Sequence, residues 1–437
     1  MTPDCTPVFT IARRVQAMLD VEVALAEAQA EVGVIPAASV APIRAAARVE
    51  RVDLHALAAE AVEAGNLLIP LVRHLTRDVA SFDAVAAGHV HLGATSQDVI
   101  DTALVLELRD GIADITKSLD RAASGAATLA RRHTLTPIAG RTWLQQATPT
   151  TFGAKAAGWL DGLERARTRL AAVPCDLQLG GATGTLFSLG PHGPAVARVL
   201  AARLGLGVAD IAWHTERSRF AEAAAALGLA CGVLGKIGRD LTLLAQTEVG
   251  EVVEAPAPGR GGSSSMPHKR NPVRAVRAVA AALQAPGLVA TMFAAMVQEH
   301  ERAAGAWQSE WDTLPRLATL TADAATAIVE ALADLAVDTA RMRAALDAAG
   351  GVACAEGLVA ALTPALGRAT AHTLVEAACA RALHDGQSLA AVATADAQIV
   401  GTLGASGIAA ALDAATFAEA AAPGVQRVLA RWHREKE

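Results

Sequence analysis

The stretch Gly261-Gly-Ser-Ser-Ser-Met-Pro-His-Lys-Arg-Asn-Pro272 decides how the rest of this 437-residue chain is interpreted. It is a glycine-led, serine-rich loop that ends in two cations and an amide. Pro272 then suits the first turn of a helix. Hydroxyl donors, a cation and an amide beside a helix N-terminus can bind an anionic substrate. Composition alone favours the simpler alternative, a linker between helices.

The composition predicts an ordered, helical protein. Hydrophobic residues make up 52% of the chain and charged residues 19%, whereas aromatic residues are only 3% and tyrosine is absent. Alanine and leucine lead the helix propensity scale, and the aromatic residues that favour strands are scarce. The sequence contains no alternation of strands and helices. We therefore expect an all-α fold.

Charge, cysteine usage and hydropathy exclude several classes of protein. A net charge of −6 disfavours a broad nucleic-acid surface. The five cysteines are scattered and never spaced as C-x-x-C, which favours reduced thiols over a disulfide framework. The N-terminus has no signal-peptide pattern, and the longest apolar run, between Glu222 and Lys236, is shorter than the ~20 residues of a membrane helix. These features predict a cytoplasmic protein without a membrane or nucleic-acid partner.

Apolar periodicity predicts several long helices. Ile100, Leu104, Leu108, Ile112, Ile115 and Leu119 recur at spacings of four and three, which is the period of a buried helical stripe. The expected long helices are 11–33, 97–133, 213–251, 272–301 and 307–337. Helices of this length bury themselves against others of similar length, so we expect a central long-helix bundle flanked by two smaller helical domains. The predicted boundaries are 1–100, 101–340 and 341–437.

Three polar segments adjoin these helices, at 88–98, 140–153 and 259–272. The first has the form Thr95-x-x-Asp98 and predicts a helix capped by a hydroxyl. The second lies within an expected turn region, Pro137 to Gly153. His89 and His91 could form a metal pair, but the spacing suggests no third ligand, and no metal or cofactor is expected.

These segments together resemble the fumarase/aspartase superfamily. Gly262 to Pro272 is similar to its GSSxMPxKxNP motif, Thr95-Ser-Gln-Asp98 to its first segment, and Gly140-Arg-Thr142 with Pro149-Thr-Thr151 to its second. Their order and spacing agree, and the resemblance covers essentially the whole chain. It implies an all-α homotetramer in which residues from three subunits form each active site.

The resemblance also implies roles for individual residues. Ser263 corresponds to the general acid/base that exchanges the proton on the carbon α to a carboxylate. A small anionic di- or tricarboxylate would be the substrate. The residues implied to contact it are His91, Thr95, Ser96, Gln97, Thr142, Trp143, Gln145, Lys269, Asn271 and Arg302. Donors aimed at the carboxylate would stabilise the enolate-like species that forms when the proton moves.

Trp143 departs from the family pattern. Superfamily members that release an amine or water have a histidine here, which protonates the leaving group. An amine, with a pKa near ~10, needs that proton, whereas a carboxylate, near ~4, leaves as the anion. The surrounding strings, including Arg141-Thr-Trp-Leu-Gln145 and Gln298-Glu-His-Glu-Arg302, look most like bacterial 3-carboxy-cis,cis-muconate cycloisomerases of the aromatic β-ketoadipate route. The resemblance therefore implies lactone formation by addition of an internal carboxylate.

Other functions remain open from the sequence. A lyase that expels another weakly basic anion, such as nitrosuccinate lyase, could also dispense with the histidine. Adenylosuccinate-lyase-like and fumarase-like activities rank lower, partly because Trp311 stands where adenylosuccinate lyases have arginine. Glu216 replaces an expected glutamine and could alter the pocket. An amidase nucleophile loop and a non-catalytic helical assembly are the alternatives from other classes.

Overall fold

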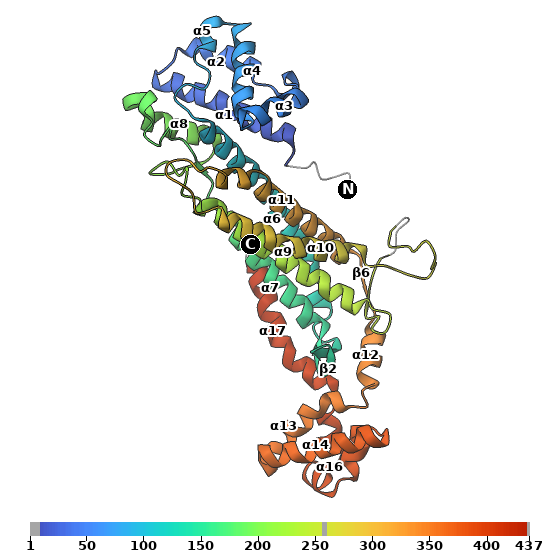
Figure 1. The fold of residues 1–437 in the computed structure, drawn as a ribbon. Coiled ribbons are helices and arrows are strands. Elements are labelled where there is room, and N and C mark those ends of the chain that lie inside the picture. The colour runs from blue at the N-terminus through green and yellow to red at the C-terminus, as the bar shows by residue number, and fades with distance from the viewer. Residues whose placement is uncertain (1–8, 256–259, 435–437) are drawn as a thin grey trace. The chain divides into compact units, whose positions relative to one another are not determined.

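The structure is a computed structural model that describes residues 9–255 and 260–434. Helices dominate this part of the chain, as the sequence predicts (Figure 1). The α-helices are α1 (Ile11–Val32), α2 (Val40–Ala46), α3 (Leu54–Ala64), α4 (Leu68–Ala80), α5 (Ala84–Ala87), α6 (Ser96–Arg132), α7 (Phe152–Ala171), α8 (Gly193–Leu204), α9 (Ser218–Leu244), α10 (Val273–Ala294), α11 (Ala306–Ala333), α12 (Thr339–Asp347), α13 (Ala355–Leu366), α14 (Arg368–Asp385), α15 (Leu389–Ala395), α16 (Ala397–Ala411) and α17 (Ala414–Arg434). The short 3-10 helices are η1 (Ala37–Ser39), η2 (Val49–Arg51), η3 (Phe187–His192) and η4 (Val352–Cys354). The cysteines at 175, 231, 354 and 379 are free thiols, and Cys5 lies outside the described residues.

Among the described residues, short strands accompany the helices in three two-stranded sheets. They are β1 (Pro137–Thr142), β2 (Gln145–Thr151), β3 (Asp176–Leu177), β4 (Gly207–Val208), β5 (Val252–Glu254) and β6 (Leu335–Val337). The β1–β2 hairpin corrects the expectation of a turn region at 137–153. Its two strands are antiparallel, with a register shift between Ala139 and Gly140. A Cβ at Gly140 would lie 2.3 Å from the Thr148 carbonyl oxygen, so the close approach of the strands requires glycine there.

The chain divides into two compact units. Of the described residues, the first comprises 9–117, 167–232 and 281–324, and the second comprises 118–166, 233–255, 260–280 and 325–434. Each unit therefore collects segments that are distant in sequence. The three-domain division at residues 100 and 340 stays a prediction.

In the first unit, α1 is terminated by standard signals. The Thr10 hydroxyl accepts a hydrogen bond from the Arg13 amide, and Gly33 ends the helix with φ +85°. The predicted inner face is buried at Val15 and Leu19. These side chains belong to an apolar core that α2, α4 and the start of α6 share.

Helix α6 is 37 residues long, and every residue of its predicted apolar stripe is buried. The stripe therefore identifies the inward face of the longest described helix. The helix begins with Ser96 and Gln97, and Thr95 stands immediately before it, so the packed stripe fixes the direction from which the first polar segment is presented.

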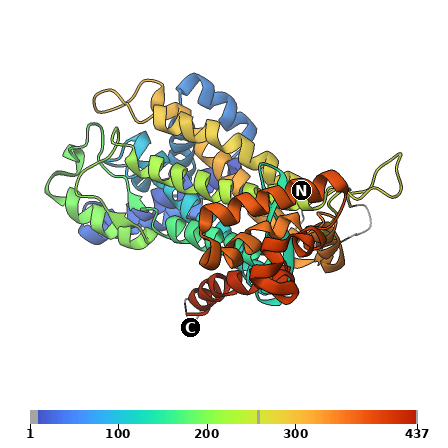
Figure 2. The same cartoon turned by 90° about the horizontal axis from the view of Figure 1, so that it is seen from below.

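The second unit contains the β1–β2 hairpin and the C-terminal helices. Helices α13 to α16 enclose a separate small core that includes Leu358, Val375, Leu389 and Ile399. Figure 1 shows α13, α14 and α16 gathered together, and the same orange helices lie together in Figure 2. Helices α13 to α16 therefore form a cluster of short helices around a core of their own.

Helices α9 and α10 are shorter than predicted. They also correct the expectation that no apolar stretch of this chain is long enough for a membrane helix. Helix α9 ends at Leu244, and α10 ends at Ala294, so the segment 295–305 is not helical. By length and composition alone, both could cross a membrane. The most apolar window of α9 is 61% buried within the structure, whereas that of α10 is only 22% buried. The apolar surface of α10 is therefore largely uncovered in a single chain.

Candidate active site

The N-terminus of α6 presents the first polar segment. The Asp98 carboxylate accepts a hydrogen bond from the Thr95 amide at 2.9 Å, which is the acidic half of a capping box. The predicted hydroxyl cap is wrong: in the described chain the Thr95 hydroxyl oxygen accepts from Arg302 Nη1 at 3.0 Å. Arg302 also donates from Nη2 to the carbonyl oxygen of Ala182 at 2.8 Å. Two predicted site residues that are far apart in sequence are thus in direct contact.

Asp98 organises the backbone around this segment. Its side chain is 1% exposed and accepts from the amides of Gly180 and Gly181, each at 2.9 Å. His214 Nε2 also lies 2.7 Å from Asp98 Oδ1. A single buried carboxylate therefore fixes both α6 and the glycine-rich segment that follows β3. The sequence suggested Asp98 only as part of a cap.

Gln97 is fully buried, and its amide group is used inside the protein. Nε2 donates to the His214 carbonyl oxygen at 2.7 Å and to Asp101 Oδ2 at 3.1 Å. Oε1 is buried without a partner in the described chain. Because both amide hydrogens are engaged, Gln97 can hold the segment in place but has no free donor for a carboxylate.

His91 and His89 have different partners. His91 Nδ1 lies 2.6 Å from Oε1 of Glu22, which is 2% exposed. Burial lowers the pKa of His91, but the hydrogen bond and negative charge of Glu22, with the charge of Asp98, raise it overall. His89 Nδ1 instead lies 2.9 Å from the Ser39 hydroxyl. The raised pKa favours a positive charge on His91, beside the predicted carboxylate-binding segment.

The β1–β2 hairpin presents the second segment on a two-residue turn. Trp143 and Leu144 occupy this turn with φ of +52° and +65°, and their side chains are 97% and 80% exposed. Thr142 and Gln145 flank the turn as a cross-strand pair and are also exposed. Positive φ at both turn positions is the geometry that usually selects asparagine and glycine. A bulky apolar pair is therefore held outward at a conformational cost.

An ion pair fixes the hairpin to the base of the third segment. Both terminal nitrogens of Arg141 donate to the carboxylate of Glu251, at 2.9 and 2.8 Å. The Glu251 side chain is fully buried, and β5 begins at the next residue. The backbone carbonyl of Glu251 also accepts from the Asp338 amide at 3.0 Å. Residues 140–145 and the strand that leads to Gly261 therefore have a common anchor, which the sequence did not indicate.

The third segment is a closed loop. The backbone N–H of Asn271 donates to the Gly261 carbonyl oxygen at 2.9 Å, and Gly261 has φ +64°. A Cβ at Gly261 would lie 2.6 Å from the Asn271 carbonyl oxygen, which explains the glycine. Ser263 Oγ accepts from the Met266 amide at 3.1 Å and lies 3.4 Å from the Ser265 amide. Backbone N–H groups aimed at a hydroxyl oxygen stabilise its alkoxide form. The Lys269 side chain is exposed.

The predicted residues thus form three local groups. His91, Thr95, Ser96, Gln97 and Arg302 belong to the first compact unit, whereas Thr142, Trp143, Gln145, Ser263, Lys269 and Asn271 belong to the second. The structure brings Arg302 onto Thr95 and closes the loop around Ser263.

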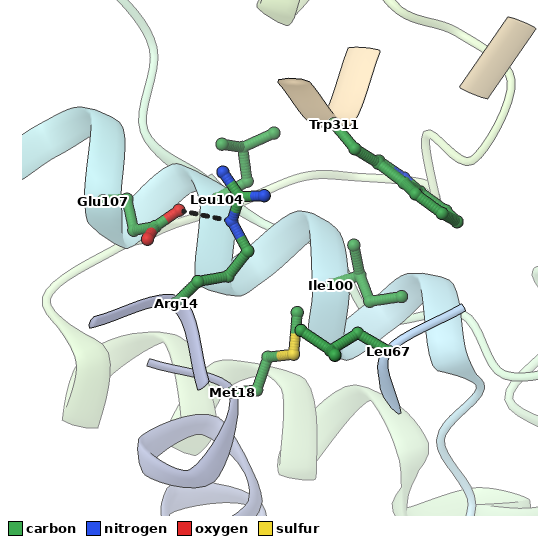
Figure 3. Close-up of a pocket in the computed structure, with 7 residues that line it drawn as sticks. All are labelled: Arg14, Met18, Leu67, Ile100, Leu104, Glu107 and Trp311. Atoms are coloured by element: carbon green, nitrogen blue, oxygen red, sulfur yellow. Dashed lines mark hydrogen bonds and ion pairs between the residues drawn. The ribbon is translucent and has the colours of Figure 1, made fainter. Parts of the chain in front are cut away.

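A cavity of about 60 Å³ lies on another face of α6 (Figure 3). Its lining residues are Arg14, Met18, Leu67, Ile100, Leu104, Glu107 and Trp311. The Glu107 side chain is fully buried; Oε2 accepts from Arg14 Nε at 3.4 Å, and Oε1 has no partner among the described residues. Burial raises the pKa of Glu107 to about 7, and the charge of Arg14 offsets only part of that effect.

We expect Glu107→Gln to stabilise the protein more at pH 8 than at pH 5.5. Because the folded state binds this proton more tightly than the unfolded state, wild-type stability falls as pH rises from the ordinary glutamate pKa to about 7. At pH 8 the buried Glu107 charge lowers the free energy of unfolding by at most about 3 kcal/mol. Urea denaturation at both pH values measures it. The exposed control Glu419→Gln should show no such difference, and an equal gain for Glu107→Gln at both pH values would contradict the burial argument.

Comparisons with known proteins agree with the predicted resemblance. A family model described as Lyase matches residues 2–287, and one described as Adenylosuccinate lyase C-terminus matches residues 351–428. The chain is 49% identical to a 3-carboxy-cis,cis-muconate cycloisomerase of Pseudomonas aeruginosa, covering 98% of this chain and 94% of that protein. It is 44% identical to a nitrosuccinate lyase of Streptomyces davaonensis, covering 94% and 88%. The crystal structure of a 3-carboxy-cis,cis-muconate lactonizing enzyme from Pseudomonas putida superposes with a TM-score of 0.92 at 45% identity, covering 97% and 95%.

Proposed function

The chain belongs to the fumarase/aspartase superfamily of lyases, and from that premise we propose that it is a cycloisomerase that converts 3-carboxy-cis,cis-muconate into 4-carboxymuconolactone. Trp143 is the observation that favours this reaction over the other activities of the family. It occupies the outward turn of the hairpin, and the family resemblance implies a histidine at this position in members that release an amine or water. An indole cannot protonate a leaving group, and an internal carboxylate nucleophile requires no such proton.

The chemistry uses few protein groups. A carboxylate oxygen of the substrate attacks a carbon of the diene, so that a C–O bond forms and the π electrons move to the carbon α to another carboxylate. Ser263 delivers a proton to that carbon and is left as an alkoxide, which the Met266 N–H stabilises until solvent returns the proton. Lys269 and Asn271, with Arg302 and Thr95, would hold the substrate carboxylates and neutralise the transient enolate-like charge.

The decisive experiment is addition of purified protein to 3-carboxy-cis,cis-muconate. Lactone formation removes the conjugated diene, so its ultraviolet absorbance should fall, and the product should be identified by mass and NMR. Nitrosuccinate is the comparison substrate, because a relative with 44% identity is named for it and the Trp143 argument also allows nitrite to leave. Turnover of nitrosuccinate without turnover of the muconate would replace the proposal with this second candidate.

We expect Trp143→His to give no increase in kcat for lactone formation. The nucleophile is already a carboxylate, so a new imidazole has no proton to remove or supply. Trp143→Phe serves as the control because it keeps an aromatic side chain on the turn. Steady-state rates for both variants measure the effect, and a marked gain for the histidine variant alone would contradict the leaving-group argument.

The proposal includes a cytoplasmic homotetramer in which several subunits form each site. Helix α10 supports assembly because Val276, Leu283 and Phe293 are 51%, 73% and 48% exposed. An apolar helix face of this kind is normally covered by another surface. Light scattering coupled to size exclusion should give four chains per particle. A monodisperse monomer with full activity would exclude shared sites.

A further inference from the structure

A buried ion network lies beneath the contact between Arg302 and Thr95. Arg217 is 1% exposed and donates to two carboxylates, with Nη1 2.7 Å from Asp101 Oδ2 and Nη2 bonded to Glu310 Oε2. Both acidic side chains are also 1% exposed. Trp307 Nε1 donates to Asp101 Oδ1 at 2.9 Å. Such a network is rigid when its groups are satisfied, because each charge has a fixed partner in a low-dielectric interior.

One arm of the network reaches the N-terminus of α6. Asp101 Oδ2 accepts from Gln97 Nε2 at 3.1 Å. Since Gln97 also donates to the His214 carbonyl oxygen, the turn of α6 that follows Thr95 is tied to the ion network. The position of the Thr95 hydroxyl is therefore set partly by Asp101.

The other arm reaches the segment that carries Arg302. Gln298 Nε2 donates to Glu310 Oε1 at 3.0 Å and to the Ala295 carbonyl oxygen at 3.0 Å. This segment, 295–305, lies between α10 and α11 and is not helical, so its backbone is not fixed by a helical ladder. His300 within it has φ +48°, and its carbonyl oxygen accepts from the Thr215 hydroxyl at 2.8 Å. Gln298 is the link from this segment to the buried charges.

We infer that Gln298 and Glu310 are positioning residues that hold Arg302 in register with Thr95 for binding of a substrate carboxylate. The inference rests on the proposed function for the identity of the substrate, although the contact itself does not. The segments that carry Thr95 and Arg302 are both hydrogen-bonded to the same buried network of Asp101, Arg217 and Glu310. A guanidinium that binds a carboxylate in fixed geometry must be held by such supporting contacts, because small displacements weaken paired hydrogen bonds.

The test is Gln298→Met, which keeps the side-chain length but removes the amide donor, leaving the Arg217 ion pairs intact. Gln16→Met is the control: Gln16 Nε2 donates to a carboxylate, on Asp20 at 2.7 Å, and to a carbonyl, on Ala47 at 3.4 Å, as Gln298 does. Gln16 Oε1 also accepts from the Val49 amide at 2.9 Å, so we expect Gln16→Met to lose at least as much thermal stability as Gln298→Met. Only Gln298→Met should raise KM for the muconate, by about tenfold, the size of one hydrogen bond to a charged group, with kcat within about twofold.

Calorimetric titration with propane-1,2,3-tricarboxylate separates the inference from the proposed function. This compound has the carboxylates but no diene, so it reports binding even if the muconate is not turned over. In the otherwise wild-type protein, Gln298→Met should raise the Kd for the tricarboxylate by about tenfold, the same factor as for KM. When Arg302 has already been replaced by alanine, adding Gln298→Met should raise the Kd by less than about twofold. If wild type binds it without converting the muconate, the proposed function fails while the positioning role stands.

Any one of several outcomes would overturn the inference. Gln298→Met could bind the tricarboxylate as tightly as wild type does. Gln298→Met could weaken tricarboxylate binding by the full tenfold even when Arg302 is already alanine. Gln16→Met could raise KM for the muconate as much as Gln298→Met does. Glu310→Gln provides the second variant because it alters the same link from the other side, and it should raise KM in the same direction. If neither variant folds, the residues are structural and the positioning role is wrong.

Discussion

Ser263→Ala is expected to reduce lactone formation by about a thousandfold, within the range for loss of a general acid. The hydroxyl is the group proposed to deliver the proton, and an alanine methyl group has none to give. The loop should remain closed, because its closure depends on the backbone hydrogen bond from Asn271 to Gly261. Steady-state rates from the diene assay, with circular dichroism and thermal unfolding for the fold, measure this.

Ser264→Ala is the matched control for that prediction. Ser264 is the next hydroxyl in the same loop and is exposed. Its loss should leave kcat within about threefold, because the residue has no proposed role in proton transfer. If Ser264→Ala is inactive while Ser263→Ala retains its rate, the proton donor has been assigned to the wrong serine.

Arg141→Met is expected to produce the largest loss of stability, about 3 kcal/mol in the free energy of unfolding, together with loss of activity. The substitution leaves the Glu251 carboxylate buried and without its two charged hydrogen bonds. It also releases β1 immediately before Thr142 and Trp143, so the turn should no longer be held in one position. Urea denaturation measures the stability, and the diene assay measures the activity.

The double variant Arg141→Met with Glu251→Met tests the cause. Removing both charges should restore most of the stability, since no uncompensated buried charge remains. Arg343→Met is the control, because its pair with Asp347 is 59% exposed on both sides and should contribute less than about 1 kcal/mol. If the double variant is no more stable than Arg141→Met, the loss does not come from the buried charge.

Long-range periodicity made the fold predictable. The stripe from Ile100 to Leu119 identified the buried face of α6 because one helix repeats its environment every three or four residues. The β1–β2 hairpin was missed because its turn has Trp143-Leu144 in place of the asparagine and glycine that usually mark such turns. The ends of α9 and α10 were placed too far along the chain because neither Leu244 nor Ala294 is followed directly by a glycine or proline that would mark the end of a helix.

Only the site residues that belong to sequence motifs could be predicted. The motif around Ser263 and the segment at Thr95 stood out because several chemistry-bearing residues are adjacent in sequence. Glu251, Asp101 and Glu310 gave no comparable signal, since each is an isolated acid whose partner lies about 90 or more positions away. Their roles come from tertiary contacts, which one sequence does not reveal.

The turn at Trp143-Leu144 has a consequence for protein engineering. Each non-glycine residue in the left-handed region carries an energetic cost of roughly 1–2 kcal/mol, so replacement by asparagine and glycine would be a routine stabilising repair. On the proposed role of Trp143, the same repair would remove the side chain that distinguishes this chemistry from amine and water release. Thermostability and substrate choice therefore favour different residues at position 143, and a consensus-style redesign should leave Trp143 unchanged.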